Sequence, residues 1–178
     1  LIQALTPGII QTDFSVEKQK EVFDFIASSD YFSGPTWMAF CKAALDATFG
    51  VEEYSSIVST MARNGTEFGI RLASMDEKEW FVGPSQKVIG PMFAGYTEED
   101  SGLDIGDSAI TETFGLGGFA MAAAPAIVAL VGGTVADATN YSLSMESITT
   151  GLNPNVTIPS LNFMGLPTGI DVIKVMQS

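Results

Sequence analysis

The segment from residue 104 to residue 118, DIGDSAITETFGLGG, contains several side chains that could do chemistry. It combines closely spaced carboxylates and hydroxyls with two adjacent glycines: Asp104, Asp107, Ser108, Thr111, Glu112, Gly117 and Gly118. Carboxylates can orient an amine or hold a divalent cation. Hydroxyls and the backbone N–H groups of a glycine turn can bind phosphate or a carboxylate. Because the chain has no histidine and one cysteine, any catalysis would depend on such groups.

Arginine provides the second candidate site, since it occurs only as Arg63 and Arg71. Arg63 precedes the dipeptide Asn64-Gly65, which is the strongest short signal for a β-hairpin because both turn residues must take positive φ. A guanidinium at a hairpin tip can bind a carboxylate or phosphate through two parallel hydrogen bonds. We therefore count Arg63, Asn64 and Gly65 as anion-binding candidates. The alternative is an exposed arginine at the end of a strand.

Two other interpretations apply to the segment 104–118. Asp104, Asp107 and Glu112 could hold a divalent metal, as in a metal-dependent hydrolase, but they lack the EF-hand spacing. Asp107 or Ser108 can instead cap a helix that begins near residue 109. The run GLGGFA satisfies G-x-G-x-x-G/A, but a helical pattern precedes it, where a dinucleotide site needs a strand. We predict no metal site and no cofactor, and close helix packing is the alternative role for the glycines.

Charge excludes several classes of partner. The net charge is −13 with only eight cationic side chains, which argues against binding to nucleic acid or to an anionic membrane surface. Residues 116–133 are uncharged, but Ala and Gly dominate this run, Pro125 interrupts it and no Lys/Arg cluster flanks it. This pattern favours a helix buried inside a globular protein over a membrane span.

The single cysteine is expected in the core rather than in a catalytic role. In the helical pattern 34–50, Pro35 lies near the start and Gly50 marks a stop. The predicted buried face of this helix consists of Trp37, Phe40, Cys41, Ala44 and Leu45. A lone cysteine excludes an internal disulfide and suits a reducing compartment, so we expect a cytoplasmic protein.

The elements that must position these candidates are predicted as helices, a sheet, and further helices. Ser15 should cap a first helix with a stripe at residues 16, 19, 22, 23 and 26. An antiparallel meander should span about 55–96, with the strand 68–73 exposing Gly69, Arg71 and Ala73 on one face. A strand is predicted at 155–163, followed by a turn and then a strand or helix over 165–176.

The helices between these strands are predicted from their caps. One begins near residue 109, and a second runs to about residue 131, where Gly132-Gly133 stops it. Thr134 and Asp137 cap a third that reaches about residue 150. The fold class is therefore α+β: a small antiparallel sheet packed with several helices, including a buried Ala/Gly-rich helix. We expect a single domain over 1–178 that forms the C-terminal domain of a longer protein, because the chain begins with Leu rather than Met.

Several long blocks resemble a known family. MARNGTEFGIR, DIGDSAITETFGLGGFAMAAAPAIV with VGGT, and PTGIDVIKV are together similar to the YlbE/AllG-like family, long catalogued as a domain of unknown function. The last block adds Thr168 and Asp171 to the candidate substrate-binding residues. The chain departs from the usual family pattern at LNFMGLPTG, where an Arg-Gly-Thr run is more common.

The resemblance implies a function that the residues alone do not. Family members are linked to allantoin catabolism, as subunits of an oxamate carbamoyltransferase that converts oxalurate and phosphate into oxamate and carbamoyl phosphate with two partner subunits. The resemblance implies no catalytic residue here, because the family's histidine- and cysteine-containing stretches lie outside this chain. We expect a small anionic substrate, partner subunits and an oligomer. The alternative is a non-catalytic structural or subunit-assembly domain.

Overall fold

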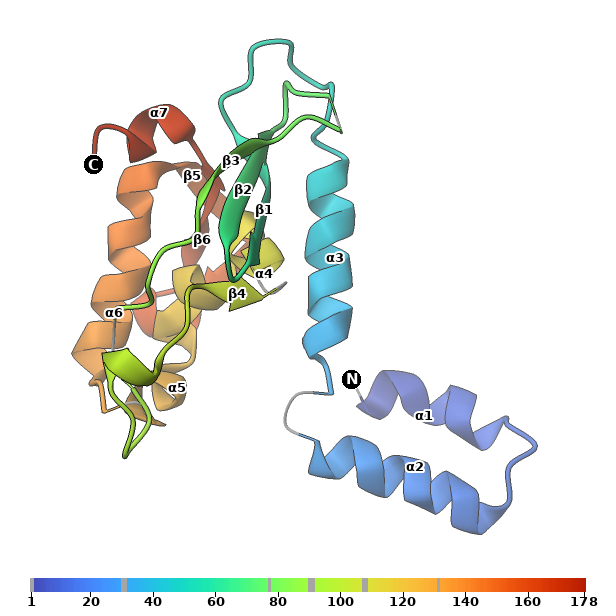
Figure 1. Cartoon of the computed structure of the whole chain (residues 1–178). Coiled ribbons are helices and arrows are strands. Elements are labelled where there is room, and N and C mark those ends of the chain that lie inside the picture. The colour runs from blue at the N-terminus through green and yellow to red at the C-terminus, as the bar shows by residue number, and fades with distance from the viewer. Residues whose placement is uncertain (1, 30–31, 77, 90–91, 107–108, 131) are drawn as a thin grey trace. The chain divides into compact units, whose positions relative to one another are not determined.

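The computed structural model describes residues 2–29, 32–76, 78–89, 92–106, 109–130 and 132–178 (Figure 1). It confirms the α+β class, with helices and small antiparallel sheets. The chain divides into two compact units, Leu1–Ala39 and Phe40–Ser178. Each unit is described by itself, and the single domain over 1–178 stays a prediction. Across the described residues, no helix is long and apolar enough to cross a membrane.

The first unit contains α1 (Ile2–Ile10), α2 (Val16–Ser28) and the beginning of α3 (Gly34–Asp46). The predicted cap of α2 is confirmed, because the Ser15 hydroxyl accepts a hydrogen bond from the N–H of Lys18. Of the predicted apolar stripe on α2, Ile26 is buried, whereas Val16 at the first position of the helix is exposed.

The buried face of α3 is narrower than predicted. Cys41 and Leu45, one turn apart, are buried in the second unit. Trp37 and Phe40 are 54% and 48% exposed, so their predicted burial is wrong. Phe40 lies at the edge of this contact, with its ring 5.3 Å from that of Phe114 in an edge-to-face arrangement. The helix also ends at Asp46, one turn before the predicted stop.

The sheet of the second unit is built on the predicted hairpin. Its strands are β1 (Val58–Asn64), β2 (Glu67–Leu72), β3 (Phe81–Pro84) and β4 (Ile105–Gly106), in the order β3-β2-β1-β4, and all neighbours are antiparallel. The predicted extension of the meander to about residue 96 is wrong in its described part, because beyond β3 Lys87 forms only an isolated bridge to Leu103.

The hairpin turn differs in register from the prediction. Arg63 pairs with Phe68, which places Gly65 and Thr66 at the centre of the turn, and only Gly65 has positive φ (+83°). Asn64 lies before the turn, and its Oδ1 accepts hydrogen bonds from the N–H groups of Thr66 (2.9 Å) and Glu67 (2.6 Å). The hairpin is confirmed, but Asn64 caps its turn instead of occupying it.

Both faces of β2 are covered in part, contrary to the prediction of an exposed face. Gly69, Arg71 and Ala73 are buried. On the other face, Ile70 and Leu72 pack with Val58, Phe119 and Ile170 in a core cluster. A β-bulge between Val58 and Thr60 keeps Val58 on this inner face, because it shifts the alternation of β1 by one residue.

Short helices follow the sheet. They are η1 (Glu98–Asp100), α4 (Ala109–Phe114), η2 (Gly117–Ala123), α5 (Pro125–Leu130), α6 (Val135–Ser144) and η3 (Met145–Ile148). The predicted capping box of Thr134 and Asp137 is confirmed. So is the stop at Gly132-Gly133, whose N–H groups bond to the carbonyls of Ala129 and Val128. The predicted capping residues of α4, Asp107 and Ser108, lie outside the described residues.

The Ala/Gly-rich run is not the single buried helix that was predicted. A 3-10 helix, η2, is followed by the short α5, and Pro125 begins the latter. Phe119, Ala122 and Val128 are buried, but Ile127 is 54% exposed. The run therefore buries only part of its surface, and proline and glycine divide it into short pieces. Similarly, α6 ends at Ser144 and not near residue 150.

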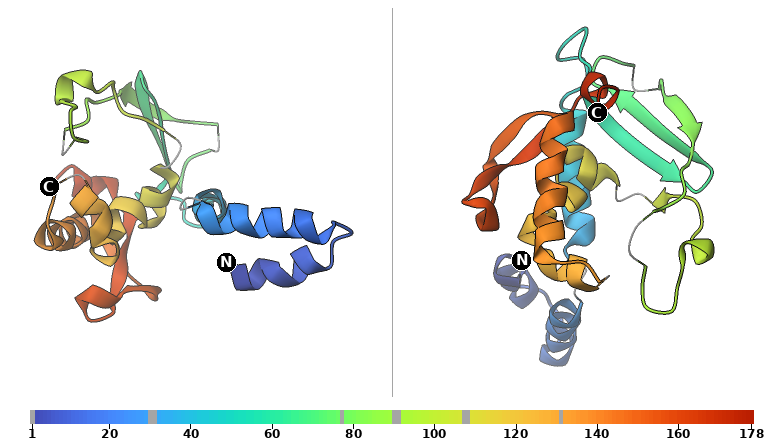
Figure 2. Two further views of the ribbon diagram at one scale, coloured as in Figure 1. Left: turned by 90° about the horizontal axis from the view of Figure 1, so that it is seen from below. Right: turned by 90° about the vertical axis from the view of Figure 1, so that its left-hand side faces the viewer.

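A C-terminal hairpin completes the fold: β5 (Thr149–Ile158), η4 (Pro159–Leu161), β6 (Met164–Ile170) and α7 (Val172–Val175). β5 begins before the strand predicted at 155–163, and β6 replaces the predicted turn. Figure 2 shows the β1–β3 sheet and the α6 helix as separate layers of the second unit. The cluster that contains Phe119 joins them, since it includes Ile70 of β2 and Met145 next to α6.

Candidate functional site

The short strand β4 brings the two predicted candidate regions together. Arg63 pairs with Gly106, and Asn64 with Ile105. Asp104 therefore lies beside Arg63, with its Oδ2 3.4 Å from Nε. The Asp104 carbonyl also accepts hydrogen bonds from the N–H of Gly65 (3.1 Å) and the hydroxyl of Ser85 (2.6 Å). Arg63, Gly65 and Asp104 thus form one group.

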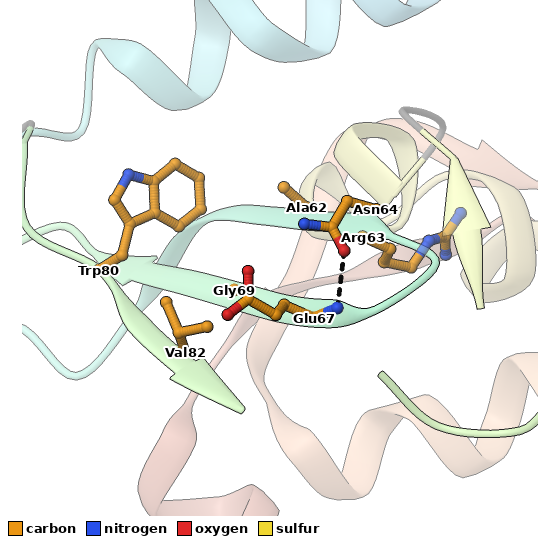
Figure 3. A pocket seen from close by; sticks show the side chains of 7 residues that line it. All are labelled: Ala62, Arg63, Asn64, Glu67, Gly69, Trp80 and Val82. Carbon is orange, nitrogen blue, oxygen red and sulfur yellow. Dashed lines mark hydrogen bonds between the residues drawn. The ribbon is translucent and has the colours of Figure 1, made fainter. Parts of the chain in front are cut away.

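This group is partly exposed. The side chain of Arg63 is 18% exposed and that of Asp104 is 32% exposed. Figure 3 shows the guanidinium at the hairpin end, turned toward β4 and away from Trp80. A guanidinium oriented by a carboxylate and partly open to solvent can bind a small anion through its outer N–H groups.

A second group forms around Glu112 on α4. Its Oε2 accepts a hydrogen bond from the Thr111 hydroxyl (2.9 Å), and its Oε1 accepts one from the N–H of Gly118 (3.1 Å). Gly117 has a φ of +59°, and a Cβ atom there would collide with the Glu112 carboxylate. The glycine turn thus already binds an anion, which is a carboxylate of the chain itself.

The environment of Cys41 is consistent with a core role. Its side chain is fully buried, and burial raises the pKa of the thiol, with a smaller upward contribution from the Glu112 carboxylate. A thiol with a raised pKa is protonated at neutral pH and is a weak nucleophile.

The remaining candidates are placed separately. The Thr168 hydroxyl on β6 donates to the Phe114 carbonyl at the end of α4 (2.8 Å). Asp171 caps α7 by accepting from the N–H of Ile173 (2.9 Å). Asp107 and Ser108 lie outside the described residues. In the part of the chain that the structure describes, no three His, Cys, Asp or Glu residues cluster as metal ligands would.

Two pockets contain residues that the sequence did not single out. One lies on the outer face of the β1–β3 sheet, has a volume of about 210 Å³ and is lined by Ala62, Arg63, Asn64, Glu67, Gly69, Trp80 and Val82 (Figure 3). The other has a volume of about 340 Å³ and is lined by Glu112, Gly118, Phe119, Met121, Tyr141 and Met145. No local motif marks Glu67 or Trp80, because only the pairing of β2 with β3 brings them together.

Comparison with known proteins identifies the family. The family model described as "Oxamate carbamoyltransferase subunit AllG" matches residues 1–108. The chain is also 41% identical over its whole length to the Escherichia coli strain K12 protein "Oxamate carbamoyltransferase subunit AllG". The chain belongs to the AllG family. It covers 42% of that E. coli protein.

Two further relatives have no stated function. The AllG-family chain is 69% identical over all of its 178 residues to "Uncharacterized protein YahG" of E. coli strain K12, of which it covers 37%. A crystal structure of a conserved protein of unknown function from Enterococcus faecalis V583 matches with a TM-score of 0.91 and 69% identity, over 99% of this chain and 42% of that one. The chain thus spans about two fifths of the length of these relatives.

Proposed function

We propose that this chain is part of an oxamate carbamoyltransferase subunit, which takes part in converting oxalurate and phosphate into oxamate and carbamoyl phosphate. The observation that supports this most directly is the 41% identity to the E. coli AllG subunit across the entire chain. The proposal includes assembly with partner subunits, a cytoplasmic location and a place in allantoin catabolism. It involves no metal or other cofactor.

The reaction requires anion-binding residues of the kind found beside β4. A phosphate oxygen attacks the carbamoyl carbon of oxalurate, the C–N bond to the oxamate nitrogen breaks, and that nitrogen takes up a proton from the phosphate. No covalent enzyme intermediate is required. The protein must orient two anions and stabilise the negative charge that develops on the carbamoyl oxygen.

Arg63 is the proposed anion-binding residue of this chain. Its guanidinium is oriented by Asp104 and partly open to solvent. Asn64 and Gly65 hold the hairpin end that presents it. The Ser108 hydroxyl is proposed as a further donor, with Asp107 as an orienting carboxylate, and the Thr111 hydroxyl could contribute only by giving up its hydrogen bond to Glu112. The N–H of Gly118 is a weaker candidate, since it already donates to Glu112.

The test uses the full-length protein that contains this chain, assembled with its partner subunits. Carbamoyl phosphate formation from oxalurate and phosphate is measured for wild type and Arg63→Ala. Loss of a positioned donor to a developing charge lowers the rate by about 100-fold or more. An unchanged rate with intact assembly would remove Arg63 from the site, and an inactive wild type would overturn the proposed reaction.

Lys20→Ala is the matched control. It removes one positive charge from an exposed pair with Asp24 on α2, so it changes the net charge equally without touching the hairpin. Arg63→Lys is the graded variant: it keeps the charge but loses the two-pronged geometry, so its rate should lie between those of wild type and Arg63→Ala.

A role in subunit assembly is the second candidate function. Large apolar side chains are exposed around β3 and the segment after it, including Phe81 (57%), Ile89 (81%) and Phe93 (66%). Such a surface is typical of an interface that another protein covers. Ile89→Asp should then reduce co-purification of the partner subunits while the isolated subunit keeps its circular dichroism spectrum. Unchanged assembly of that variant would argue against this role.

A further inference from the structure

The outer face of the β1–β3 sheet has the features of a small-molecule site. Its middle row consists of Ala62, Gly69 and Val82, which pair across the three strands. These small side chains form the floor of the pocket of about 210 Å³. The ring of Trp80 lies over Gly69, where an added Cβ would come within 2.9 Å of the indole Cε3. The indole therefore forms a flat wall close to the sheet (Figure 3).

The aromatic wall is held in place by a buried arginine. The Arg71 guanidinium lies 4.7 Å from the centre of the Trp80 ring and 4.8 Å from that of Phe49. Its Nη2 donates to the hydroxyl of Thr60 (3.0 Å). A cation between two aromatic faces restricts both rings. Trp80 thus presents its other surface in a fixed orientation at low entropic cost.

The opposite end of the pocket offers one hydrogen-bond donor and one acceptor. Asn64 uses Oδ1 to cap the hairpin turn, which fixes the orientation of its amide. Figure 3 shows Nδ2 on the side that faces Trp80, and the Glu67 side chain extends along β2 with its carboxylate over Gly69. An N–H donor beside a carboxylate acceptor is complementary to a primary amide or ureido group, whose carbonyl accepts and whose N–H donates.

We propose that this face binds a small planar molecule with an amide or ureido group, which stacks on Trp80 and forms hydrogen bonds with Asn64 Nδ2 and the Glu67 carboxylate. Arg63, the proposed anion-binding residue, also lines this pocket, so the inference deepens the proposed function and rests on it.

Binding is tested by calorimetric titration of the full-length protein with oxamate, in the absence of phosphate and partner subunits. Oxalate is the matched probe, because it replaces the NH₂ group with an oxygen of similar size. Oxamate should bind and oxalate should bind at least tenfold more weakly. Equal binding of the two molecules would overturn the proposal. So would the absence of oxamate binding at oxamate concentrations up to 20-fold above an expected Kd of ~1 mM. Because turnover is not measured, its failure is separate from a failure of the carbamoyl-transfer assay.

Two variants assign the contacts. Asn64→Asp retains Oδ1, and with it the turn cap, but removes the donor, so oxamate affinity should fall about tenfold or more. Asn153→Asp is the matched control, since its Oδ1 caps a turn in the same way by accepting from the N–H of Asn155. Equal losses in the two variants would overturn the assignment.

Glu67→Ala gives a result that distinguishes hydrogen bonding from simple charge effects. Removing a negative charge should strengthen the binding of an anion if Coulomb interactions alone decide the affinity. If the carboxylate accepts the amide N–H, oxamate affinity falls by about tenfold. Tighter oxamate binding in Glu67→Ala would contradict the proposed contact with the Glu67 carboxylate. Trp80→Leu should also weaken oxamate binding, because it removes the stacking surface. Thermal unfolding of each variant shows whether the fold is retained.

Discussion

The carboxylate of Glu112 accepts a hydrogen bond from the backbone N–H of Gly118, over a distance of 3.1 Å. Through this contact, the glycine turn between α4 and η2 binds an acidic side chain of the same chain. The positive φ of Gly117 is what allows the approach. The glycines that resemble a nucleotide-binding motif thus have a structural role at this turn.

Gly117→Ala should therefore destabilise the protein more than Gly118→Ala. A Cβ at position 117 meets the Glu112 carboxylate and requires a left-handed backbone, whereas one at position 118 comes no closer than 3.9 Å to Glu112. We expect a loss of about 1–3 kcal/mol in the free energy of unfolding for the first variant and less than about 1 kcal/mol for the second. Urea denaturation measures both, and equal losses would contradict the role of the Glu112–Gly118 contact.

Cys41 should make stability fall at alkaline pH. Its pKa is raised in the folded protein, first by burial, above the usual value of about 8.5 that it has when unfolded. Below that value the thiol is protonated in both states and has no effect. As the pH rises above it, the unfolded state loses a proton that the folded state retains, so the free energy of unfolding decreases.

The comparison that tests this is wild type against Cys41→Ala between pH 7 and pH 10. The alanine variant should be less stable at pH 7 because of the cavity, and the difference between the two proteins should narrow as the pH rises. Parallel pH profiles would show that the thiol titrates alike in both states.

The turn at Gly65 should be similarly sensitive to a side chain. Gly65 has a φ of +83°, and a Cβ there would lie 3.3 Å from Cδ1 of Ile105 on β4. Gly65→Ala should lower the free energy of unfolding by about 1–2 kcal/mol. It should also displace β4, which holds Asp104 beside Arg63. Gly83→Ala on β3 is the control, because it has ordinary backbone angles and nothing within 4 Å. Chemical shifts of the Ile105 methyl groups report the displacement, and their invariance in Gly65→Ala would contradict it.

The features that could be predicted from the sequence depend on local signals. The hairpin at Asn64-Gly65, the cap at Ser15 and the capping box of Thr134 and Asp137 each involve residues close in the chain. The register of the turn could not be predicted, because an asparagine can occupy a turn or cap it with its side chain. The Ala/Gly run is divided into η2 and α5 at Pro125, which begins α5. A proline can either begin a helix or interrupt one, and the sequence does not show which of these applies until the preceding turn is known.

The candidate site was predictable only as a list of residues. β4 is two residues long, and no local pattern distinguishes it from a polar loop. Its pairing with β1 is a tertiary event that helps to bring Asp104 to Arg63. The pocket beneath Trp80 was missed for the same reason. Arg71 was expected on an exposed face, and its burial follows from the aromatic rings of Phe49 and Trp80 that cover it.

Asp137 should contribute to stability at neutral pH and not in strong acid. Hydrogen bonds from the hydroxyl and the N–H of Thr134 lower its pKa below the usual aspartate range. A lowered pKa means that the stabilisation is present above the unfolded value and is lost as the pH falls through the folded one. Asp137→Asn should lower the melting temperature at pH 7 relative to wild type, and the difference between the two proteins should shrink as the pH falls below the usual aspartate pKa of about 3.9. A constant difference across this range would exclude the ionised cap.

Arg71→Lys tests whether the wall of the outer pocket depends on the stacked guanidinium. Lysine keeps the charge but cannot stack as a plane between two rings or reach Thr60 with the same geometry. Because Arg71 is only 8% exposed, we expect a loss of about 1–3 kcal/mol in the free energy of unfolding. In a Trp37→Phe background of the 178-residue chain, Trp80 is the one remaining indole. Its fluorescence anisotropy should fall in Arg71→Lys because the ring gains freedom. A destabilised variant with unchanged anisotropy would mean that Arg71 supports the sheet without holding the indole, and that the pocket wall has another support.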